Sequence, residues 1–434
     1  MNTIELSEDD KKAKQSLAFL KNLFASHSER NFGVRLWDGS YLPPDPGKTR
    51  RFTLVINHPG ALRKLLWHPT ELGLGEAYVF KDLDIEGDME AALKLREVLA
   101  GIHLNWREKI PFAKWMLSLP ATDKAYKSHA AVPVNGDPSA RDRVRKAISF
   151  HYDLPVPFWE KVLDDSMQYS CAYFHSWEEE LTNAQIHKLD YICRKLMLKP
   201  GETLLDVGCG WGGLILHAAK HYGVQSLGIT LSREQAEFAR ARIREQGLTS
   251  QCRVELVDFR DLTGTERFDK IASVGSVEHF HTFLDVYFQT TWRLLKPGGL
   301  FLNHGIAVDC AYSLKPNATS FMNRYVFPDG DLVPLKKTIN LAEDTGFEVR
   351  DVENLREHYA QTLRLWVENL ERRQEAIRKI CGEVTWRIFK LYMTACAHNF
   401  SMGNLHLFQT LMAKSDHGRT PLPATRSDWY AEEF

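Results

Sequence analysis

The residues best placed to do chemistry lie around a glycine-rich loop near the middle of the chain. The loop has the spacing Gly208-x-Gly210-x-x-Gly213, and it directly follows the apolar run Leu204-Leu205-Asp206-Val207. Dinucleotide-binding loops share this spacing, which is weak evidence by itself. Glycine at 208 and 210 would let the backbone approach a ligand that a Cβ atom would obstruct. The alternative is that these glycines serve only a tight turn between a strand and a helix.

The acidic residues near this loop indicate which ligand it binds. Asp206 stands where its carboxylate would repel the pyrophosphate of a dinucleotide, and the next strand ends in Ile229-Thr230 without an acid for a ribose diol. An aspartate before the loop suits the cationic amino-acid end of S-adenosylmethionine (SAM). Asp258, at the end of the third strand, is the candidate acceptor for the adenine amino group. The sequence therefore predicts a SAM site.

The elements that must position these residues alternate between strand and helix. We expect strands at 204–207, 226–230, 252–257, 269–274 and 300–304, and helices at 214–221, 232–247 and 283–295. Ser232 and Gln235 have the spacing of a capping box, which marks the start of the second helix. The alternation predicts an α/β fold with a parallel, doubly wound, Rossmann-like sheet whose ligands bind at the carboxyl ends of the strands.

The first 140 residues differ from the rest and contain neither a phosphate-loop glycine pattern nor a catalytic cluster. A helix at 13–24, a strand at 51–56 and a helix from about Ala61 predict a small α+β unit. Turn-forming residues across 130–140 predict a boundary. We therefore expect an N-terminal domain over 1–140 and a second domain over 141–434; the family resemblance given below implies lipid association for the first and catalysis for the second. Aromatic residues and lysines alternate across 105–127, which fits either a lipid headgroup interface or a surface helix that covers the core.

Composition narrows the classes of function. The 55 basic and 56 acidic residues give a net charge of -1, so no overall attraction to nucleic acid is expected. No run approaches the roughly 18 apolar residues that a spanning helix needs. The acidic N-terminus lacks the apolar core of a secretion signal, and the seven cysteines form no Cys-x-x-Cys pair. These features predict a reduced, cytoplasmic compartment.

Several separate motifs, in order along the chain, resemble the cyclopropane-fatty-acid synthase family of SAM-dependent methyltransferases. They are Gln168-Tyr169-Ser170-Cys171-Ala172-Tyr173-Phe174, the glycine loop with its preceding strand, Gly228-Ile229-Thr230-Leu231-Ser232-Arg233-Glu234-Gln235, Val277-Glu278-His279-Phe280, Asn303-His304-Gly305-Ile306 and Tyr325-Val326-Phe327-Pro328-Asp329-Gly330. The resemblance runs from His151 to about Phe408, and the N-terminal part carries weaker signatures.

The resemblance implies SAM-dependent transfer of a methylene group to the double bond of an unsaturated phospholipid acyl chain. Its SAM contacts fall on Tyr169, Ser170, Gly208, Gly210, Thr230, Gln235 and Asp258, beside the Asp206 inferred above. Gln235 has a second interpretation as the capping-box residue. The family's base is a bound bicarbonate, and its binding groups fall on Cys171, Glu278, His304, the backbone of Ile306, and Tyr325. The sequence Glu278-His279-Phe280-His281 has no second ligand motif nearby, so no metal is expected.

The implied chemistry leaves the product open. Methyl transfer to an alkene leaves a carbocation, which aromatic faces stabilise by roughly 0.5–2 kcal/mol each. Aromatic residues near the motifs could line such a pocket or simply pack in the core, and they are Tyr173, Phe174, Phe280, Phe321, Tyr325 and Phe327. Bacterial cyclopropane synthases commonly have Gly-Met-Phe before the Glu-His pair, where this chain has Gly275-Ser276-Val277. After the pair, this chain has Phe280-His281 instead of a sequence with glycine at the second position. Direct loss of a proton from the new methyl group closes a cyclopropane. If a hydride shift comes first, proton loss gives a methylene-branched chain, which a later reduction makes methyl-branched.

A phospholipid substrate implies binding at the cytoplasmic membrane surface without a spanning segment. A local basic cluster, formed by Arg141, Arg143, Arg145 and Lys146, is a candidate docking site; its alternative is a solvated helix face. A homodimer, and a reductase partner for a methylene-branched product, are left open. An alternative from another class is a lipid-binding scaffold without catalysis, and the intact anion-site residues disfavour it.

Overall fold

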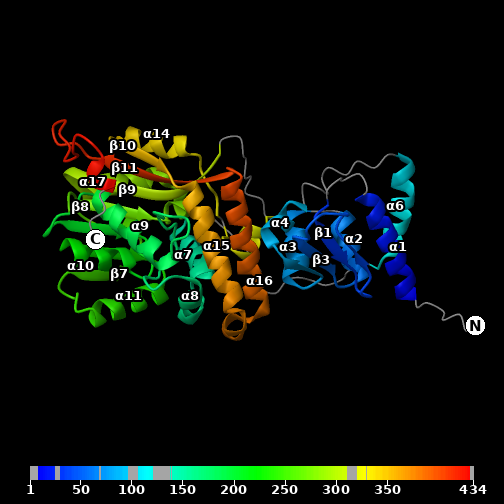
Figure 1. The fold of residues 1–434 in the computed structure, drawn as a ribbon. Coiled ribbons are helices and arrows are strands. Elements are labelled where there is room, and N and C mark those ends of the chain that lie inside the picture. Colours follow the sequence, from blue (N-terminus) through cyan, green and yellow to red (C-terminus); the bar gives the residue numbers. More distant parts are fainter. Residues whose placement is uncertain are drawn as a thin grey trace, which may run out of the picture. The chain divides into compact units, whose positions relative to one another are not determined.

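The computed structural model describes residues 8–24, 30–67, 70–95, 106–120, 137, 139–309, 320–328 and 330–430. The chain forms two compact units (Figure 1). The first unit comprises Met1–Ala130 together with Ala318–Tyr325 and Glu383–Ala395, and the second comprises Ala131–Asn317, Val326–Gly382 and Cys396–Phe434. The first unit thus includes two segments from the region that the sequence analysis assigned to 141–434. The predicted linker, 130–140, lies largely outside the described residues.

The first unit is built on a four-stranded sheet in the order β2-β1-β3-β4. β1 and β3 are parallel, and the other two pairs are antiparallel. Its elements are α1 (Glu8–Leu23), β1 (Phe32–Arg35), β2 (Tyr41–Leu42), β3 (Phe52–Ile56), α2 (Pro59–Trp67), α3 (Glu71–Val79), β4 (Leu83–Gly87), α4 (Met89–Leu93), α6 (Trp106–Ser118) and α13 (Phe321–Tyr325). All five residues of β3 are buried, so this apolar strand forms the centre of the small core.

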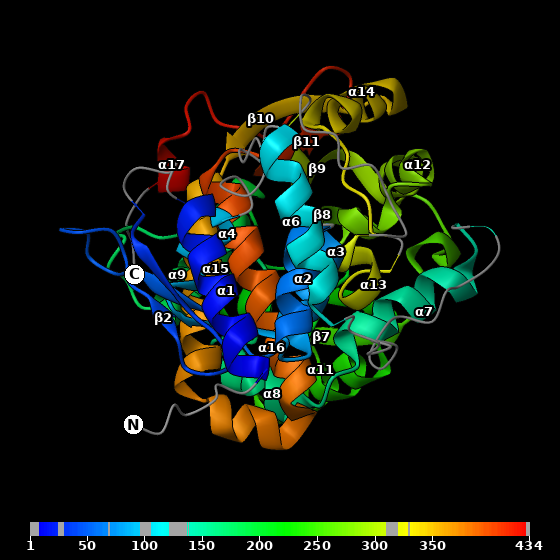
Figure 2. The ribbon, with the colours of Figure 1, turned by 90° about the vertical axis from the view of Figure 1, so that its right-hand side faces the viewer.

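Helix α6 carries the aromatic and basic stretch singled out in the sequence, and it can be followed with α1 and α2 in Figure 2. Its described aromatic side chains pack inward, because the ring of Phe19 in α1 lies 5.2 Å from Phe112 and 4.2 Å from Trp115, centroid to centroid. The opposite face exposes Ile110 (54%) and Leu117 (61%). The helix therefore covers the core with one face and presents apolar side chains to the surroundings with the other.

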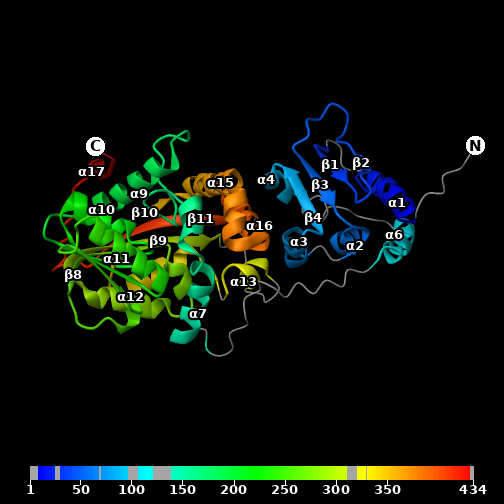
Figure 3. The same cartoon turned by 90° about the horizontal axis from the view of Figure 1, so that it is seen from below.

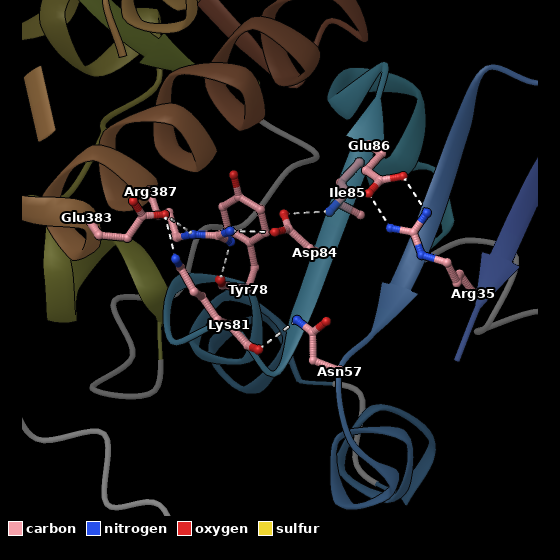
Figure 4. A network of polar contacts seen from close by, with 9 residues as sticks. All are labelled: Arg35, Asn57, Tyr78, Lys81, Asp84, Ile85, Glu86, Glu383 and Arg387. Carbon is pink, nitrogen blue, oxygen red and sulfur yellow. Dashed lines mark hydrogen bonds and ion pairs between the residues drawn. The ribbon is translucent and has the colours of Figure 1, made fainter. Parts of the chain in front are cut away.

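Part of helix α16 (Gln374–Ser401) belongs to the first unit, where a buried arginine anchors it (Figure 4). The helix is interrupted at Gly382, whose φ of 80° is outside the helical region. Beyond this break, Arg387 donates to the carboxylate of Asp84 at 2.6 Å, to that of Glu383 at 2.9 Å and to the carbonyl of Tyr78 at 2.8 Å. The guanidinium also lies over the Tyr78 ring, 4.7 Å from its centroid. These contacts fix the segment against α3 and β4.

The second unit has the predicted doubly wound α/β fold, built on a seven-stranded sheet in the order β10-β11-β9-β8-β5-β6-β7. Strands β5 to β9 pair in parallel, whereas β11 pairs antiparallel with β9 and β10. The strands are β5 (Thr203–Val207), β6 (Gln225–Thr230), β7 (Cys252–Leu256), β8 (Phe268–Val274), β9 (Leu295–Val308), β10 (Glu348–Asn354) and β11 (Leu405–Ala413). The sequence did not indicate the two C-terminal strands.

Helices cover both faces of this sheet (Figure 3). They are α7 (Arg141–Tyr152), α8 (Val156–Val162), α9 (Leu181–Lys195), α10 (Gly213–Tyr222), α11 (Arg233–Glu245), α12 (Leu284–Leu294), α14 (Leu335–Thr345), α15 (Arg356–Arg372), parts of α16, and α17 (Ser427–Tyr430), with short 3-10 turns η1 (Phe259–Asp261) and η2 (Val277–Phe280). Alternate residues of each strand face opposite sides: Leu204 packs in a core with α9 and α10, and Leu205 in one with α12. None of the described helices has the length and apolar content of a membrane span.

Candidate active site

The main pocket of the second unit opens at the carboxyl ends of the parallel strands, beside β5, where the strand order reverses. Ligands of doubly wound sheets bind at this position. The pocket holds about 950 Å³ of empty space, its open mouth included. Every residue predicted to contact SAM lines it, namely Tyr169, Ser170, Asp206, Gly208, Gly210, Thr230, Gln235 and Asp258. The structure therefore brings this whole set together, although its contacts with SAM stay predictions.

Different local constraints explain why glycine occupies positions 208 and 210 of the loop. Gly208 has φ 84°, and a Cβ atom there would lie 2.6 Å from the Cβ of Ser276, so the turn itself excludes a side chain. Gly210 has φ 53°, and a Cβ atom there would meet nothing within 4 Å, because the residue borders the pocket. Of the two interpretations of the loop, the tight turn thus applies to Gly208, whereas the space beside Gly210 is available to a ligand.

Asp206 presents an unsatisfied acceptor at this pocket. The residue is buried, and its Oδ1 atom has no hydrogen-bond partner among the described residues. Burial raises the pKa of Asp206 to about 7, and the positive charge of Lys188 acts in the opposite direction. A buried carboxylate without a partner is costly, so a cationic donor such as the amino group of SAM fits here.

The polar residues after β6 show how Gln235 serves two purposes. Its backbone N–H donates to the Ser232 Oγ atom at 3.3 Å, which caps α11. Its side-chain Oε1 accepts from the Thr230 hydroxyl at 2.7 Å. No described residue bonds the Nε2 group, so the amide can donate into the pocket. Both interpretations of Gln235 are compatible, because the cap uses its backbone N–H and leaves the side-chain amide for the cofactor.

Asp258 is already engaged by a neighbour. Its two carboxylate oxygens accept from Arg260 at 2.9 Å and 2.6 Å, and Oδ1 also accepts from the Arg260 backbone N–H at 3.0 Å. A carboxylate has about four acceptor positions, so a further bond to an adenine amino group is compatible with these contacts. The arginine fixes the orientation of the carboxylate at the pocket wall.

The residues predicted to bind the anion lie mostly in the second unit. Glu278, in η2, accepts the backbone N–H of Ile306 through Oε1 at 2.7 Å, and its Oε2 atom is buried without a partner among the described residues. Burial raises the pKa of Glu278 to about 7, against the effect of the Ile306 hydrogen bond. His304, two residues before Ile306 on β9, is fully buried, and its Nδ1 atom lies 3.2 Å from the Gln409 amide.

His304 and Cys171 are electrically neutral groups in this setting. Burial, together with the charges of Lys188 and Lys195, holds the pKa of His304 well below its usual value, and its Nε2 atom has no partner among the described residues. Burial raises the pKa of Cys171, so its thiol stays protonated and donates to the carbonyl of Ala172 at 3.2 Å. Both side chains can therefore serve as neutral hydrogen-bonding groups.

Tyr359, a buried residue of α15, lies near part of this set and was not predicted from the sequence. Burial raises the pKa of its phenol, and Tyr169, Cys171 and Glu278 contribute to the shift. Those three groups therefore all lie within electrostatic range of one buried hydroxyl. Nothing in the local sequence indicates this role, because α15 lies nearly 200 positions after Tyr169.

Tyr325 is the exception among the predicted anion-site residues. It belongs to α13 in the first unit, where its hydroxyl donates to the carboxylate of Glu76 at 2.9 Å. Its membership of an anion site therefore stays a prediction. Of the other aromatic candidates, Phe280 lines the main pocket, whereas Phe327 packs on His151 with a centroid separation of 4.0 Å and Phe321 packs on Tyr325.

The basic cluster predicted to meet lipid lies on α7 and is partly neutralised. Arg141 pairs with Asp261 at 2.8 Å, and Arg145 pairs with Asp142 at 3.0 Å. Both arginines remain well exposed. Arg141 and Arg145 thus have acidic neighbours, which weakens the cluster as a docking site.

The fold and the pocket together define a SAM-dependent methyltransferase. Residues 139–410 match the protein family described as mycolic acid cyclopropane synthetase, and the chain belongs to this family. Residues 19–100 match a separate family that is described only as a domain of unknown function.

Individual relatives agree with this assignment. A probable fatty acid methyltransferase from Pseudomonas putida is 38% identical over 402 residues, which is 92% of this chain and 95% of the relative. The cyclopropane-fatty-acyl-phospholipid synthase of Escherichia coli is 37% identical over 265 residues, 61% of this chain and 66% of that protein. The crystal structure of mycolic acid cyclopropane synthase CmaA1, complexed with S-adenosylhomocysteine and CTAB, superposes with a TM-score of 0.58 at 33% identity, covering 62% of this chain and 97% of that one.

Proposed function

We propose that the protein transfers a methylene group from SAM to the double bond of unsaturated phospholipid acyl chains and so forms cyclopropane fatty acids. The observation that carries this proposal is the pair of buried, unpartnered atoms in the second unit, Oε2 of Glu278 and Nε2 of His304. Each of these atoms can form a hydrogen bond, so a small polar ligand placed against them would satisfy both. Bicarbonate fits, because it offers both an O–H donor and anionic oxygens.

Each of the site residues would have a separate role in the reaction. SAM, when bound, supplies an electrophilic methyl group, and bicarbonate would supply the base that removes a proton from it. Asp206 and the free amide of Gln235 would hold the cofactor's polar end. Glu278 would accept the O–H of the anion, and His304 would hold one of its oxygens. Burial of this set keeps water, which would quench a carbocation, away from the reacting carbon.

One specific finding supports an alternative product. The relative that this chain matches over 95% of its length is named a probable fatty acid methyltransferase rather than a cyclopropane synthase. A mid-chain methylene or methyl branch would need the same cofactor site and a different fate for the cation. A reductase partner would be required only if the final product is methyl-branched.

The product can be identified by expressing the protein in a host that lacks cyclopropane lipids. We expect the proton NMR spectrum of the extracted phospholipid to show the upfield signals of ring protons, and a Glu278→Gln variant to lose them. Olefinic methylene signals or a branched methyl group would establish the alternative product. Unchanged lipid, with the protein folded and able to bind SAM, would refute both.

The role of bicarbonate is tested separately with purified protein in buffer freed of carbon dioxide. We expect the rate of lipid modification to fall at least tenfold and to recover when bicarbonate is added back, because the depleted buffer removes the proposed base. Full activity in the depleted buffer would contradict the proposed base.

We also propose that the first unit meets the membrane surface through α6. Ile110 and Leu117 lie two turns apart on its exposed face, and the exposed Lys114 lies between them. Apolar side chains beside a cation are typical of helices that lie in a lipid interface. This placement would bring the protein to its phospholipid substrate.

A further inference from the structure

Helix α9 contains two fully buried lysines that differ in how their charges are compensated. Lys188 and Lys195 lie seven positions apart, and both have an exposed fraction of 0%. The Nζ atom of Lys195 lies 2.5 Å from the carboxylate of Glu353 and 3.4 Å from that of Asp351. The Nζ atom of Lys188 instead bonds two neutral oxygens, Gln168 Oε1 at 2.7 Å and Ser170 Oγ at 2.9 Å.

No carboxylate of the described residues lies within ion-pairing distance of Lys188. A buried ammonium that lacks a paired carboxylate is costly even when it is hydrogen-bonded. Burial lowers the pKa of Lys188 to about 8, and Asp164, Cys171 and Asp206 counteract that effect from a greater distance. The ammonium is therefore still mostly charged near neutral pH, and its charge is compensated less than that of Lys195.

The hydrogen bonds of Lys188 determine what the pocket wall can offer a ligand. An ammonium group only donates, so the Ser170 hydroxyl oxygen must accept from it. The single hydroxyl proton of Ser170 is then left to be donated elsewhere. Gln185, one turn earlier on α9, donates to the Ser170 carbonyl at 2.9 Å. Helix α9 thus fixes this serine at both its backbone and its side chain.

Ser170 and Gln168 both line the cofactor pocket, whereas Lys188 lies behind them. The wall therefore offers an O–H donor backed by a positive charge. The amino-acid end of SAM carries one group that matches this pair, its carboxylate, while its amino group suits Asp206. We propose that Lys188 is a positioning residue for the cofactor: it orients Ser170 and supplies the positive potential that binds the cofactor carboxylate.

The test measures binding of S-adenosylhomocysteine by calorimetry, with decarboxylated S-adenosylhomocysteine as the matched probe. Lys188→Met should weaken binding of the full ligand roughly tenfold or more, as expected for loss of a charge-assisted contact. It should change binding of the decarboxylated ligand by less than about threefold. Equal weakening of both ligands, or no weakening of either, would overturn the proposal.

Two further variants separate positioning from packing. Lys195→Met removes a buried lysine from the same helix and should leave both affinities unchanged. In a Ser170→Ala background, Lys188→Met should lose much of its effect on the full ligand, because the lysine acts through that serine. If Lys188→Met does not fold, as judged by its circular dichroism, Lys188→Gln replaces it in the same comparisons.

The result of these affinity measurements does not depend on which lipid product the protein forms. Binding is measured without lipid, so a failure here would leave the proposed cyclopropanation standing. Conversely, a wild-type protein that binds S-adenosylhomocysteine but modifies no lipid would refute the proposed function and leave the role of Lys188 to be decided by these affinities.

Discussion

Asp206 is a buried residue whose carboxylate lines the cofactor pocket and leaves one oxygen without a partner among the described residues. Its folded-state pKa, about 7, lies above the ordinary value of 3.8. The folded protein therefore binds this proton more tightly than the unfolded chain does. Between these two pKa values, stability contributed by the protonated form is lost as the pH rises.

The expected loss of stability with rising pH gives a prediction for the ligand-free protein. Asp206→Asn should bind S-adenosylhomocysteine at least tenfold more weakly, yet its melting temperature relative to wild type should increase between about pH 5 and about pH 8. Thermal denaturation at both pH values and calorimetry provide the measurements. A variant that loses stability relative to wild type as the pH rises would contradict the assignment of an unpaired buried carboxylate.

Glu278 gives a second prediction at the same scale. Glu278→Gln should lower kcat by roughly a hundredfold or more, because it removes the carboxylate expected to orient the anion. The affinity for S-adenosylhomocysteine should stay within about threefold of wild type, since Glu278 does not line the main pocket. The exposed Asp285→Asn serves as the control acid. Loss of cofactor binding in the glutamine variant would place Glu278 in a different role.

At the scale of elements, alanine substitutions can test whether a glycine of the loop is needed only for the backbone turn or also for contact with the ligand. Gly210→Ala and Gly247→Ala both place a Cβ atom on a residue with positive φ (53° and 69°) and with nothing within 4 Å. Each should lower the free energy of unfolding by about 1 kcal/mol. Only Gly210 lines the pocket, so only its alanine variant should lose cofactor affinity. Equal affinities would show that the loop does not closely approach the ligand.

The anchor of α16 is an element-scale feature of the first unit. Arg387→Ala would remove the buried guanidinium that Asp84 and Glu383 share, although Glu383 keeps its ion pair with Lys81 at 3.3 Å. The variant should destabilise this unit by about 3 kcal/mol. Lys379→Ala, on an exposed part of the same helix, should cost less than about 0.5 kcal/mol. Denaturant unfolding followed by circular dichroism compares them. Similar midpoints would mean that the arginine network contributes little.

The sequence predicted the elements that depend on local pattern. Strands β5 to β8 and helices α10 to α12 follow from apolar runs, glycines and the cap at Ser232, so Asp206, the glycine loop and Asp258 could be placed at one sheet edge. The other predicted SAM contacts, Tyr169, Ser170, Thr230 and Gln235, came from the family resemblance. The role proposed for Lys188 could not be predicted, because it depends on the packing of α9 behind Gln168 and Ser170. The antiparallel strand β11 pairs with β9 about 100 positions earlier, and no local signal marks that pairing.

At the scale of the whole molecule, membrane binding should depend on the exposed face of α6. Ile110→Ser combined with Leu117→Ser should reduce flotation with anionic phospholipid vesicles, because each residue loses apolar area that the lipid would cover. Met402→Ser, at a similarly exposed residue (55%) in the second unit, should float like wild type. Unchanged flotation of the double variant would exclude α6 as the docking element.

The division into two units also changes what the sequence suggested about whole-chain organisation. A single boundary near 140 explains neither Ala318–Tyr325 nor Glu383–Ala395, which pack in the first unit through contacts such as Tyr325 with Glu76 and Arg387 with Asp84. These side chains lie more than 200 positions from their partners. Only the folded chain shows that the N-terminal unit is completed by later segments.

The most direct test combines purified protein, SAM labelled with carbon-13 in its methyl group, and vesicles of an unsaturated phospholipid. The account predicts that the label appears in the ring methylene of a cyclopropane, where the upfield protons show coupling to it. Label recovered in a methyl branch, or no label in the lipid while cofactor binding is intact, would contradict it.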